Sequence, residues 1–352
     1  MSNYRNFNQG IRRNVKNEKV YSITSQLTRK KPRVVFILVT LLLSFLFVEL
    51  LCRGLLFYRT PTALSFDDEI VFTFKPHSKY YGRKINNIGC LGDDIVEKKK
   101  DEVRIFLLGG STSLTTAYVN TVKKILSQRY PERYLNVISC GKQRYTSYIN
   151  RVNLEKNLLQ HQPDIVVNYM GINDNFYNTF PWVEDLSNIG YFNWASLKES
   201  IFFRMFYYYI IEKEIRSNPA YTRDEIRSGG IFEKNLRSII QTARDNGISV
   251  VLSTFAISFP PENEAMKKRI IQTQKPWEHS LGHYESAAMG VEVHNNIMRK
   301  LAREYDLPLG KVDEAIPRNL DYFDDICHLT NKGRLLLGEK IANTIIQSGY
   351  IE

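Results

Sequence analysis

Two short stretches far apart in the chain contain the residue types that nucleophilic acyl transfer requires. Ser111 follows two glycines in "RIFLLGGSTSLT", residues 104–115, and Asp325 precedes His328 by three positions in "DDICHLTNKG". A serine hydroxyl becomes a strong nucleophile when a base removes its proton, and His328 is the candidate base for Ser111. Asp325 can accept a hydrogen bond from the second ring nitrogen of His328 and stabilise the imidazolium that forms.

Acyl transfer also needs hydrogen-bond donors around the oxygen that becomes negatively charged. The candidate donors of this oxyanion hole are the backbone N–H groups of Ser111 and Gly141 and the side-chain amide of Asn173 in "MGIND". We expect a glycine at 141 because a side chain there would crowd the substrate. We also expect Ser111 to lie at the turn from strand to helix, where the N-terminus of the helix supplies N–H groups and a partial positive charge. Asp174 is interpreted as structural.

Each of these residues also has a plain structural interpretation. Gly109 and Gly110 make a tight turn, Ser111 caps a helix, and Asn173 belongs to an ordinary turn. A phosphate-binding loop is excluded because the lysine of G-x-x-x-x-G-K-[ST] is missing. In "EHSLGH", His279 and His283 lack the glutamate of a helical zinc motif, so we predict no metal site. The ordered set of residues favours catalysis over these separate interpretations.

Alternating strand and helix patterns predict the elements that position the candidate residues. The apolar strand-like runs are 103–109, 134–140, 164–170, 247–255 and 307–313, and helical spacing occupies 117–129, 148–160, 231–245, 291–304 and 330–347. This alternation predicts an α/β fold, a doubly wound parallel sheet that is buried on both faces. Ligands bind beyond the carboxyl ends of such strands, where the candidate residues stand.

The motifs around these residues resemble those of a known family. Ser111 in "GGST", Gly141, Asn173 in "GIND" and His328 in "DICH" follow the order of the SGNH subgroup of the GDSL hydrolases. "INNIGCLGDD" and "HLTNKGRLLLGEKIA" are similar to segments of membrane-anchored members. The resemblance covers roughly 85–345 and implies a flavodoxin-like three-layer α/β/α fold, an acyl-enzyme mechanism and no cofactor. Gly110 replaces the aspartate of many members, and Ser139-Cys140 replaces a more usual Asn-Ala.

The net charge of +11 is concentrated in the N-terminal tail. Residues 1–33 contain nine Lys and Arg residues and one acidic residue, Glu18, so the rest of the chain retains 39 basic and 36 acidic residues. A nucleic-acid-binding protein places its basic residues on a folded face, with aromatic residues among them. We therefore predict that nucleic acid is not a partner.

An uncharged segment follows the basic tail. "VVFILVTLLLSFLFV", residues 34–48, extends through Leu51 to about 18 residues, which is near the minimum for spanning a bilayer. We interpret 34–54 as a signal anchor; a cleaved signal peptide and a buried core helix are the alternatives. The basic residues before the segment predict a cytoplasmic N-terminus and an extracytoplasmic catalytic domain.

The chain therefore divides into four predicted parts. These are a basic cytoplasmic tail (1–33), the anchor (34–54), a lead-in segment (55–100) and the catalytic domain (101–352). The charge run "EKKKDE" that ends the lead-in is interpreted as solvated surface. An aromatic-rich insert at about 176–230 interrupts the catalytic domain. We expect a helix that packs these aromatics onto the core; a lid over the substrate or a face resting on the membrane are the alternatives.

The cysteines do not predict a disulfide framework. Cys52 stands at the membrane edge, and Cys90, Cys140 and Cys327 are an odd number, which favours buried free thiols over one disulfide. The sequence does not determine the oligomeric state.

Together these features predict a serine-dependent esterase that acts on acyl esters, and by position and resemblance on O-acetyl groups of envelope or exported polysaccharide. The alternatives are an O-acyltransferase with the same acyl-enzyme, a lipid esterase, and a non-catalytic carbohydrate-binding protein. Trp182, Trp194 and Trp277 are candidates for stacking on sugars or for core positions.

Overall fold

The computed structural model describes residues 33–67, 70–180, 195, 197–198, 200–212 and 217–351. The chain divides into two compact units. The first unit consists of Met1–Arg59 and Asn193–Met205, and the second consists of Thr60–Phe192 and Phe206–Glu352. The basic tail, Trp182 and Trp194 lie outside the described residues.

The first unit contains one long apolar helix, Arg33–Arg59. Within the described part of the chain it is the one helix whose length and composition suffice to cross a membrane. Only 6% of its most apolar window is buried, and Phe36 and Phe47 are 72% and 68% exposed. A core helix buries such side chains, so the alternative of a buried core helix is wrong.

The second unit is built on a five-stranded parallel sheet of order β6-β5-β7-β8-β9. Side chains of the fully buried inner strand β5 alternate between two cores, with Ile105 and Leu107 in one and Phe106 and Leu108 in the other. The predicted α/β fold with a doubly wound parallel sheet is confirmed. The strands are β5 Glu102–Gly109, β6 Tyr134–Ser139, β7 Ile165–Tyr169, β8 Ser249–Ser253 and β9 Leu309–Gly310.

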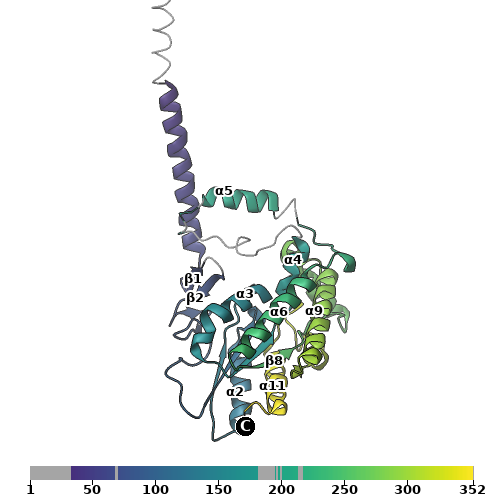
Figure 1. Cartoon of the computed structure of the whole chain (residues 1–352). Helices are drawn as coiled ribbons and strands as arrows, with labels where there is room; N and C mark the ends of the chain where they lie inside the picture. The colour runs from purple at the N-terminus through teal and green to yellow at the C-terminus, as the bar shows by residue number, and fades with distance from the viewer. Residues whose placement is uncertain are drawn as a thin grey trace, which may run out of the picture. The chain divides into compact units, whose positions relative to one another are not determined.

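Helices cover both faces of this sheet, as Figure 1 shows. The face that carries Ile105 packs against α2 (Thr116–Arg129) and α11 (Asn331–Ser348). The opposite face packs against Leu154 and Leu158, which follow α3 (Ser147–Asn153), against α6 (Ser228–Asp245) and against the C-terminal half of α9 (Tyr284–Glu304). The three layers agree with the flavodoxin-like arrangement that the resemblance implies.

Some elements differ from the predicted ones. The predicted helix 148–160 is α3 followed by a π-helical turn, Leu154–Leu158, and a 3-10 turn, Leu159–His161. Further short elements have no counterpart among the predicted ones. They are β1 Leu64–Asp67, β2 Val71–Phe74, β3 Lys79–Tyr80, β4 Arg83–Lys84, α4 Phe176–Thr179, α7 Glu264–Gln274, α8 Glu278–Leu281 and α10 Val312–Ala315.

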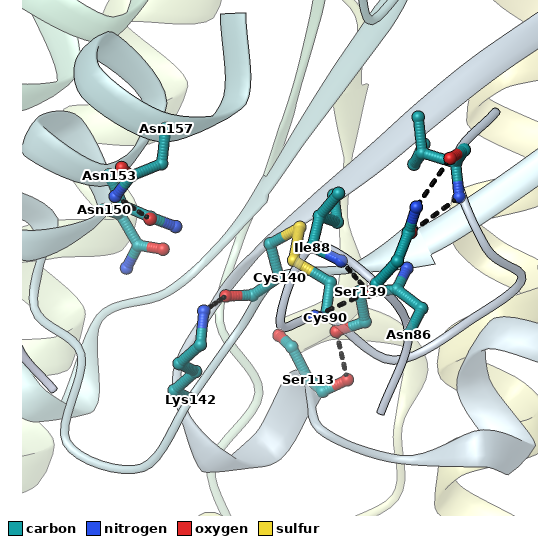
Figure 2. The surroundings of a disulfide bond; sticks show 12 residues. Asn86, Ile88, Cys90, Ser113, Ser139, Cys140, Lys142, Asn150, Asn153 and Asn157 are labelled. Carbon is teal, nitrogen blue, oxygen red and sulfur yellow. Dashed lines mark hydrogen bonds between the residues drawn. A yellow bond between two sulfur atoms is a disulfide. The ribbon is translucent and has the colours of Figure 1, made fainter. Parts of the chain in front are cut away.

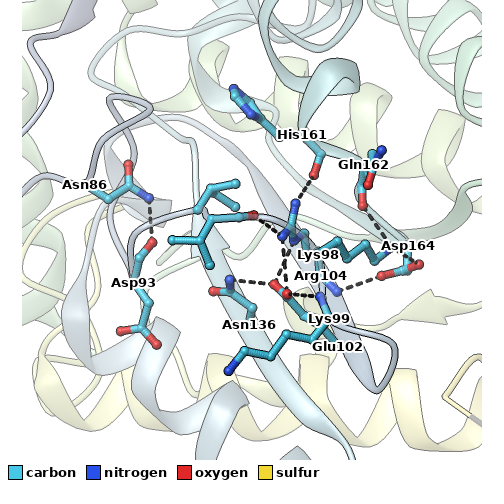
Figure 3. Close-up of polar contacts among 12 residues, drawn as sticks. Asn86, Asp93, Lys98, Lys99, Glu102, Arg104, Asn136, His161, Gln162 and Asp164 are labelled. Atoms are coloured by element: carbon cyan, nitrogen blue, oxygen red, sulfur yellow. Dashed lines mark hydrogen bonds and ion pairs between the residues drawn. The ribbon is translucent and has the colours of Figure 1, made fainter.

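The charge run at the end of the lead-in is not simply solvated surface. Glu102 is 5% exposed and forms an ion pair of 2.7 Å with Arg104, which is 2% exposed. Arg104 also donates to the carbonyl of His161, and Lys98 pairs with Asp164 at 2.6 Å (Figure 3). Buried charges need such partners, and here they join the amino-terminal parts of β5 and β7. This is the end of the sheet opposite to the candidate site.

The aromatic insert also departs from its main prediction. Part of it lies outside the described residues; the rest includes α5 (Ile201–Phe206) and a π-helical turn, Tyr207–Glu212. Tyr208 is buried, but Phe203 and Phe206 are 59% and 53% exposed. The expectation that this helix packs its aromatic side chains onto the core is therefore wrong for most of the aromatic residues described in it. Successive positions point to different sides of a helix, so adjacent aromatic residues cannot all face the core.

Candidate active site

Four loops at one edge of the second unit contain the residues that the sequence singles out. Ser111 follows β5 on a 3-10 turn, Ser111–Ser113, and Gly141 follows β6. Asn173 lies on the 3-10 turn Ile172–Asn175 after β7, and Asp325 and His328 lie in the loop before α11. Because parallel strands end at the same edge of the sheet, the order of the fold brings these loops together.

Ser111, His328 and Asp325 form a continuous hydrogen-bonded chain. The Oγ of Ser111 lies 2.9 Å from Nε2 of His328, and Nδ1 of His328 lies 2.7 Å from Oδ2 of Asp325. The other oxygen of Asp325 accepts hydrogen bonds from the backbone N–H groups of Cys327 and His328, at 2.8 and 2.7 Å. Both carboxylate oxygens are thus held, which fixes the orientation of the imidazole.

The charges in this chain favour an ionised Asp325 and a basic His328. Burial alone would raise the pKa of Asp325, but hydrogen bonds from His328 and from the backbone hold it below its ordinary value. The pKa of His328 is raised. A thiolate at Cys327 would raise it most, but burial raises the pKa of the Cys327 thiol, which therefore stays uncharged near neutral pH. We assign the raised pKa of His328 to its hydrogen bond with Asp325.

The same residues form a possible metal-binding set. Among the described residues, Asp325, Cys327 and His328 are the one group whose ligand atoms lie within 4.8 Å of one another. Each ring nitrogen of His328, however, already faces a hydrogen-bond partner, Asp325 on one side and Ser111 on the other. This arrangement suits proton transfer better than metal coordination. His283 instead lies 3.0 Å from Glu278.

The local structure at Ser111 differs from the predicted helix start. Helix α2 begins five residues later, at Thr116, with Thr115 as its N-cap. The N–H groups beside Ser111 therefore come from the 3-10 turn, and the expectation that the N-terminus of the following helix supplies them is wrong. Ser113 points away from the site, since it is fully buried and donates to the carbonyl of Tyr169 at 3.4 Å.

Asn173 lies directly beside the glycine that precedes Ser111. A Cβ at Gly110 would be 2.5 Å from Nδ2 of Asn173, a distance that two such atoms cannot occupy without movement. Asn173 also donates to the carbonyl of Tyr145 at 3.0 Å. The close approach gives a physical reason for glycine at position 110, where many relatives of the SGNH type have aspartate. Asp174 is structural as predicted, since it accepts hydrogen bonds from Ser147.

Gly141 is required by packing and not by the space that a substrate needs. A Cβ at this position would be 2.8 Å from Cβ of Ser113 and 2.9 Å from the carbonyl oxygen of Gly110. Gly141 itself is buried. The predicted reason for a glycine here, that a side chain would crowd the substrate, is therefore wrong. A glycine is needed because this loop packs against the turn that carries Ser111.

A cavity of about 200 Å³ opens beside the hydrogen-bonded chain. Ser111, Asn173, Asp325 and His328 all line it, whereas Gly141 is not one of its lining residues. The rest of the wall is mainly apolar and aromatic, as in many small-molecule sites. Its apolar residues are Val71, Phe72, Ile149, Ile172, Phe176, Tyr208, Trp277, Leu281 and Ile326.

Several of these wall residues were not identified from the sequence. Phe72 comes from β2 in the lead-in, where only the alternating "VFTF" hints at a strand. Tyr208 comes from the aromatic insert, and Arg144 lies 5.2 Å from the centre of the Trp277 ring. Trp277 is 45% exposed, so it is not a core residue.

A disulfide bond connects the lead-in to the loop that contains Gly141. Cys90 and Cys140 are joined (Figure 2). Cys52 and Cys327 are free. The prediction of free thiols at 90 and 140 is wrong, because the count of cysteines cannot show that the lead-in folds back against β6. Leu91 and Ser139 form an isolated bridge that places the two cysteines side by side.

We expect Cys90→Ser to lower both stability and turnover. A disulfide with a sequence separation of 50 residues contributes about 2–4 kcal/mol to the free energy of unfolding. Cys140 directly precedes Gly141, so loss of the bond should also loosen that loop and lower kcat by about tenfold. Thermal inactivation and ester hydrolysis by the full-length protein measure both effects. Cys52→Ser is the control, and unchanged values in Cys90→Ser would show that the disulfide does not support the loop.

Comparison with known proteins supports this picture. Residues 90–335 match the sequence profile of the GDSL-like lipase/acylhydrolase family. A search of curated proteins found none whose sequence is similar to this chain.

Among solved structures, a GDSL-like lipase from Bacteroides thetaiotaomicron is 17% identical, with a TM-score of 0.44 over 72% of this chain and 92% of that one. An acetylxylan esterase from Geobacillus stearothermophilus is 16% identical, with a TM-score of 0.43 over 70% and 94%. The family match covers more than half of the chain and contains the loops of Ser111, Gly141, Asn173 and His328. The protein belongs to the GDSL-like lipase/acylhydrolase family and is a serine hydrolase of the esterase type.

Proposed function

We propose that the protein hydrolyses O-acyl esters, most simply O-acetyl groups, of envelope or exported polysaccharide, with Ser111, His328 and Asp325 as its catalytic residues. The observation that carries the proposal is the unbroken contact from the Ser111 hydroxyl through the His328 ring to the Asp325 carboxylate, beside a cavity. A binding protein has no need of this charge arrangement, so the contact argues against the non-catalytic alternative.

The mechanism follows from these contacts. As Oγ of Ser111 attacks the acyl carbon, Nε2 of His328 takes the hydroxyl proton, and Asp325 stabilises the imidazolium. The tetrahedral intermediate then expels the sugar oxygen, which receives that proton from His328, and leaves an acyl ester on Ser111. A water molecule attacks this ester while His328 again accepts a proton. Acid is released, and the proton returns to the serine oxygen.

The N–H groups of Ser111 and Gly141 and the amide of Asn173 form the proposed oxyanion hole. Asn173 is best supported, since its amide lies beside Gly110 and its side chain lines the cavity. Gly141 has less support, since it is buried and is not one of the residues that line the cavity. Donors of this kind are fixed before the reaction and need no reorganisation when charge develops.

We expect Asn173→Ala to lower kcat about a hundredfold with a small change in KM, because one donor to the oxyanion is lost. Steady-state hydrolysis of a nitrophenyl acetate ester measures both constants. Asn157→Ala, at a position outside the cavity, is the matched control. Full activity of Asn173→Ala would remove this side chain from the oxyanion hole.

The raised pKa of His328 predicts how activity depends on pH. The imidazole accepts a proton only when it is neutral, so activity should increase as pH rises through this pKa. Because the pKa lies above the ordinary value of 6.5, half-maximal kcat/KM should be reached on the alkaline side of that value. A pH profile of the wild-type enzyme with a neutral ester tests this. An acid limb centred below 6.5 would contradict the proposed effect of Asp325 on His328.

Two observations support an extracytoplasmic position for this site. The helix Arg33–Arg59 has the length and composition of a membrane span and follows a basic tail. The bond between Cys90 and Cys140 belongs to the second unit, and disulfides persist in oxidising compartments outside the cytoplasm. We therefore propose a single-pass anchor with a cytoplasmic N-terminus and an exported catalytic unit. Protease protection of the full-length protein in intact cells tests the orientation.

The substrate is tested by mass spectrometry of acids released from acetylated polysaccharides, with the wild type compared with Ser111→Ala. Acetate released only by the wild type supports the proposal. Transfer of the acyl group to an added sugar would show an acyltransferase with the same acyl-enzyme. The apolar wall of the cavity favours a lipid ester as the second candidate. Release of longer acids from lipid esters, with no acetate from polysaccharide, would replace the first assignment.

A further inference from the structure

We propose that residues 200–205, here called the interfacial segment, lie at the edge of the hydrocarbon core, next to the headgroups, where the helix Arg33–Arg59 leaves the bilayer. The occupant that we assign to the exposed apolar side of the segment is therefore the lipid surface. This inference rests on the proposed membrane anchor. The contacts that carry it lie within the first unit, and Figure 1 shows α5 running away from the long N-terminal helix.

The first step is the contact that ties the segment to the helix. Glu49, within the apolar helix, is only 8% exposed. Its carboxylate accepts hydrogen bonds from Oγ of Ser200 at 2.8 Å and from the backbone N–H groups of Ile201 and Phe202, each at 2.9 Å. Arg53, one turn further on, pairs with the same carboxylate at 2.7 Å. A buried carboxylate needs such partners, so Glu49 fixes the start of the segment at its own level.

Aromatic packing strengthens the same junction. The ring of Phe45 lies 6.4 Å from that of Phe202, in an edge-on arrangement, and 5.4 Å from that of Phe203. Phe45 precedes Glu49 by one helical turn and therefore lies on the same side of the helix. Ring contacts and hydrogen bonds thus join the segment to two successive turns of the proposed anchor.

The second step is the depth of this junction. Glu49 stands sixteen residues after Arg33, which corresponds to a rise of about 24 Å along a helix. The hydrocarbon core is about 30 Å thick, so an anchor that begins at Arg33 places Glu49 within about 6 Å of the far edge. Arg53 then lies at that edge, where its charge reaches the headgroups. The segment that Glu49 holds begins at the same depth.

The third step is the chemistry of the exposed side chains. Phe203 is 59% exposed, and Leu197, which precedes the segment in the same unit, is 91% exposed. Large apolar side chains that are this exposed beside a proposed membrane span fit a lipid surface better than water. Aromatic side chains are enriched at the membrane interface, where the ring contacts lipid and a polar edge reaches water. The lipid surface therefore fits this side of the segment.

Depth-dependent fluorescence quenching by brominated lipids tests the proposal. The full-length protein with Phe203→Trp is reconstituted in vesicles of phosphatidylcholine that carries bromine either near the headgroup or near the end of the acyl chain. The unsubstituted protein supplies the background of the native tryptophans. Leu42→Trp, about 14 Å along the helix from Arg33, reports on the middle of the bilayer. Leu335→Trp, on exposed α11 of the second unit, is the control that we expect to remain unquenched.

We expect Phe203→Trp to be quenched about twofold more by shallow than by deep bromine, and Leu42→Trp to show the reverse order. Quenching of Leu42→Trp without quenching of Phe203→Trp would overturn the inference and leave the anchor intact. A second copy of the chain that covers Phe203 in place of lipid would also leave Phe203→Trp unquenched, and would likewise overturn the inference. Absence of quenching at both positions would contradict the anchor itself.

A second variant tests the tether. Glu49→Ala should reduce the quenching of Phe203→Trp to the level of the Leu335→Trp control, with no change in the quenching of Leu42→Trp. The activity of this variant in detergent serves as a measure of intact folding, because Glu49 does not belong to the catalytic unit. Undiminished quenching of Phe203→Trp in Glu49→Ala would overturn the role of the carboxylate in setting the depth of the segment.

Discussion

Ser111→Ala is expected to lower kcat by at least about a thousandfold, because the atom that attacks the acyl carbon is removed. KM should change little, since the walls of the cavity are unaltered. The residual rate comes from the oxyanion donors and from substrate binding. Steady-state hydrolysis of an acetyl ester by the purified full-length protein measures the loss.

Ser113→Ala supplies the matched control for this experiment. Ser113 is two residues away on the same turn, but it is fully buried and donates to the carbonyl of Tyr169. Its removal should affect stability slightly and activity little. A fluorophosphonate probe should label the wild type and Ser113→Ala, and should fail to label Ser111→Ala. Equal labelling of Ser111→Ala would identify a different nucleophile and refute the proposed mechanism.

The second large effect is expected for Asp325→Asn, which should lower kcat by about a thousandfold to ten-thousandfold. The asparagine amide would present an N–H to Nδ1 of His328, which in the wild type donates to Asp325. The ring then adopts the other tautomer, and Nε2 carries a proton where it should accept one from Ser111. Loss of the carboxylate also removes the cause of the raised pKa of His328, so the acid limb of the pH profile should move to lower pH.

Asp324→Asn is the control, since this neighbouring carboxylate is 52% exposed and faces Arg334 at 3.8 Å. It should retain almost all of the activity. Measurement of kcat from acidic to alkaline pH in both variants separates the two effects. If Asp325→Asn kept the wild-type rate and pH profile, Asp325 would have no part in orienting His328.

Local patterns in the sequence were sufficient to predict the core of the fold. The continuous apolar runs at 103–109 and 164–170 become the buried strands β5 and β7, because a strand covered on both faces needs apolar side chains at every position. The turns that follow them carry Ser111 and Asn173. The order of strands and helices then decides which ends meet, so much of the candidate site was predictable without coordinates.

Features that depend on long-range contacts were not predictable. The partner of Cys140 is set by the path of the lead-in, which forms a bridge from Leu91 to Ser139. Glu102 looks solvated within a charge run, but it is buried, pairs with Arg104 and accepts a hydrogen bond from Asn136 on the neighbouring strand β6. The sequence pattern shows the polarity of each side chain, whereas the partner that makes burial favourable comes from another segment.

By itself the sequence determined the α/β alternation, the apolar N-terminal helix and the residues that we propose for acyl transfer. Only the tertiary structure decided that the Ser111 hydroxyl meets His328, that Asn173 fills the space beside Gly110, and that Phe72 and Tyr208 help to wall the cavity. The physical reason is that periodicity and turn chemistry act over a few neighbouring residues. Distances between side chains from separate segments are fixed only when the whole core packs.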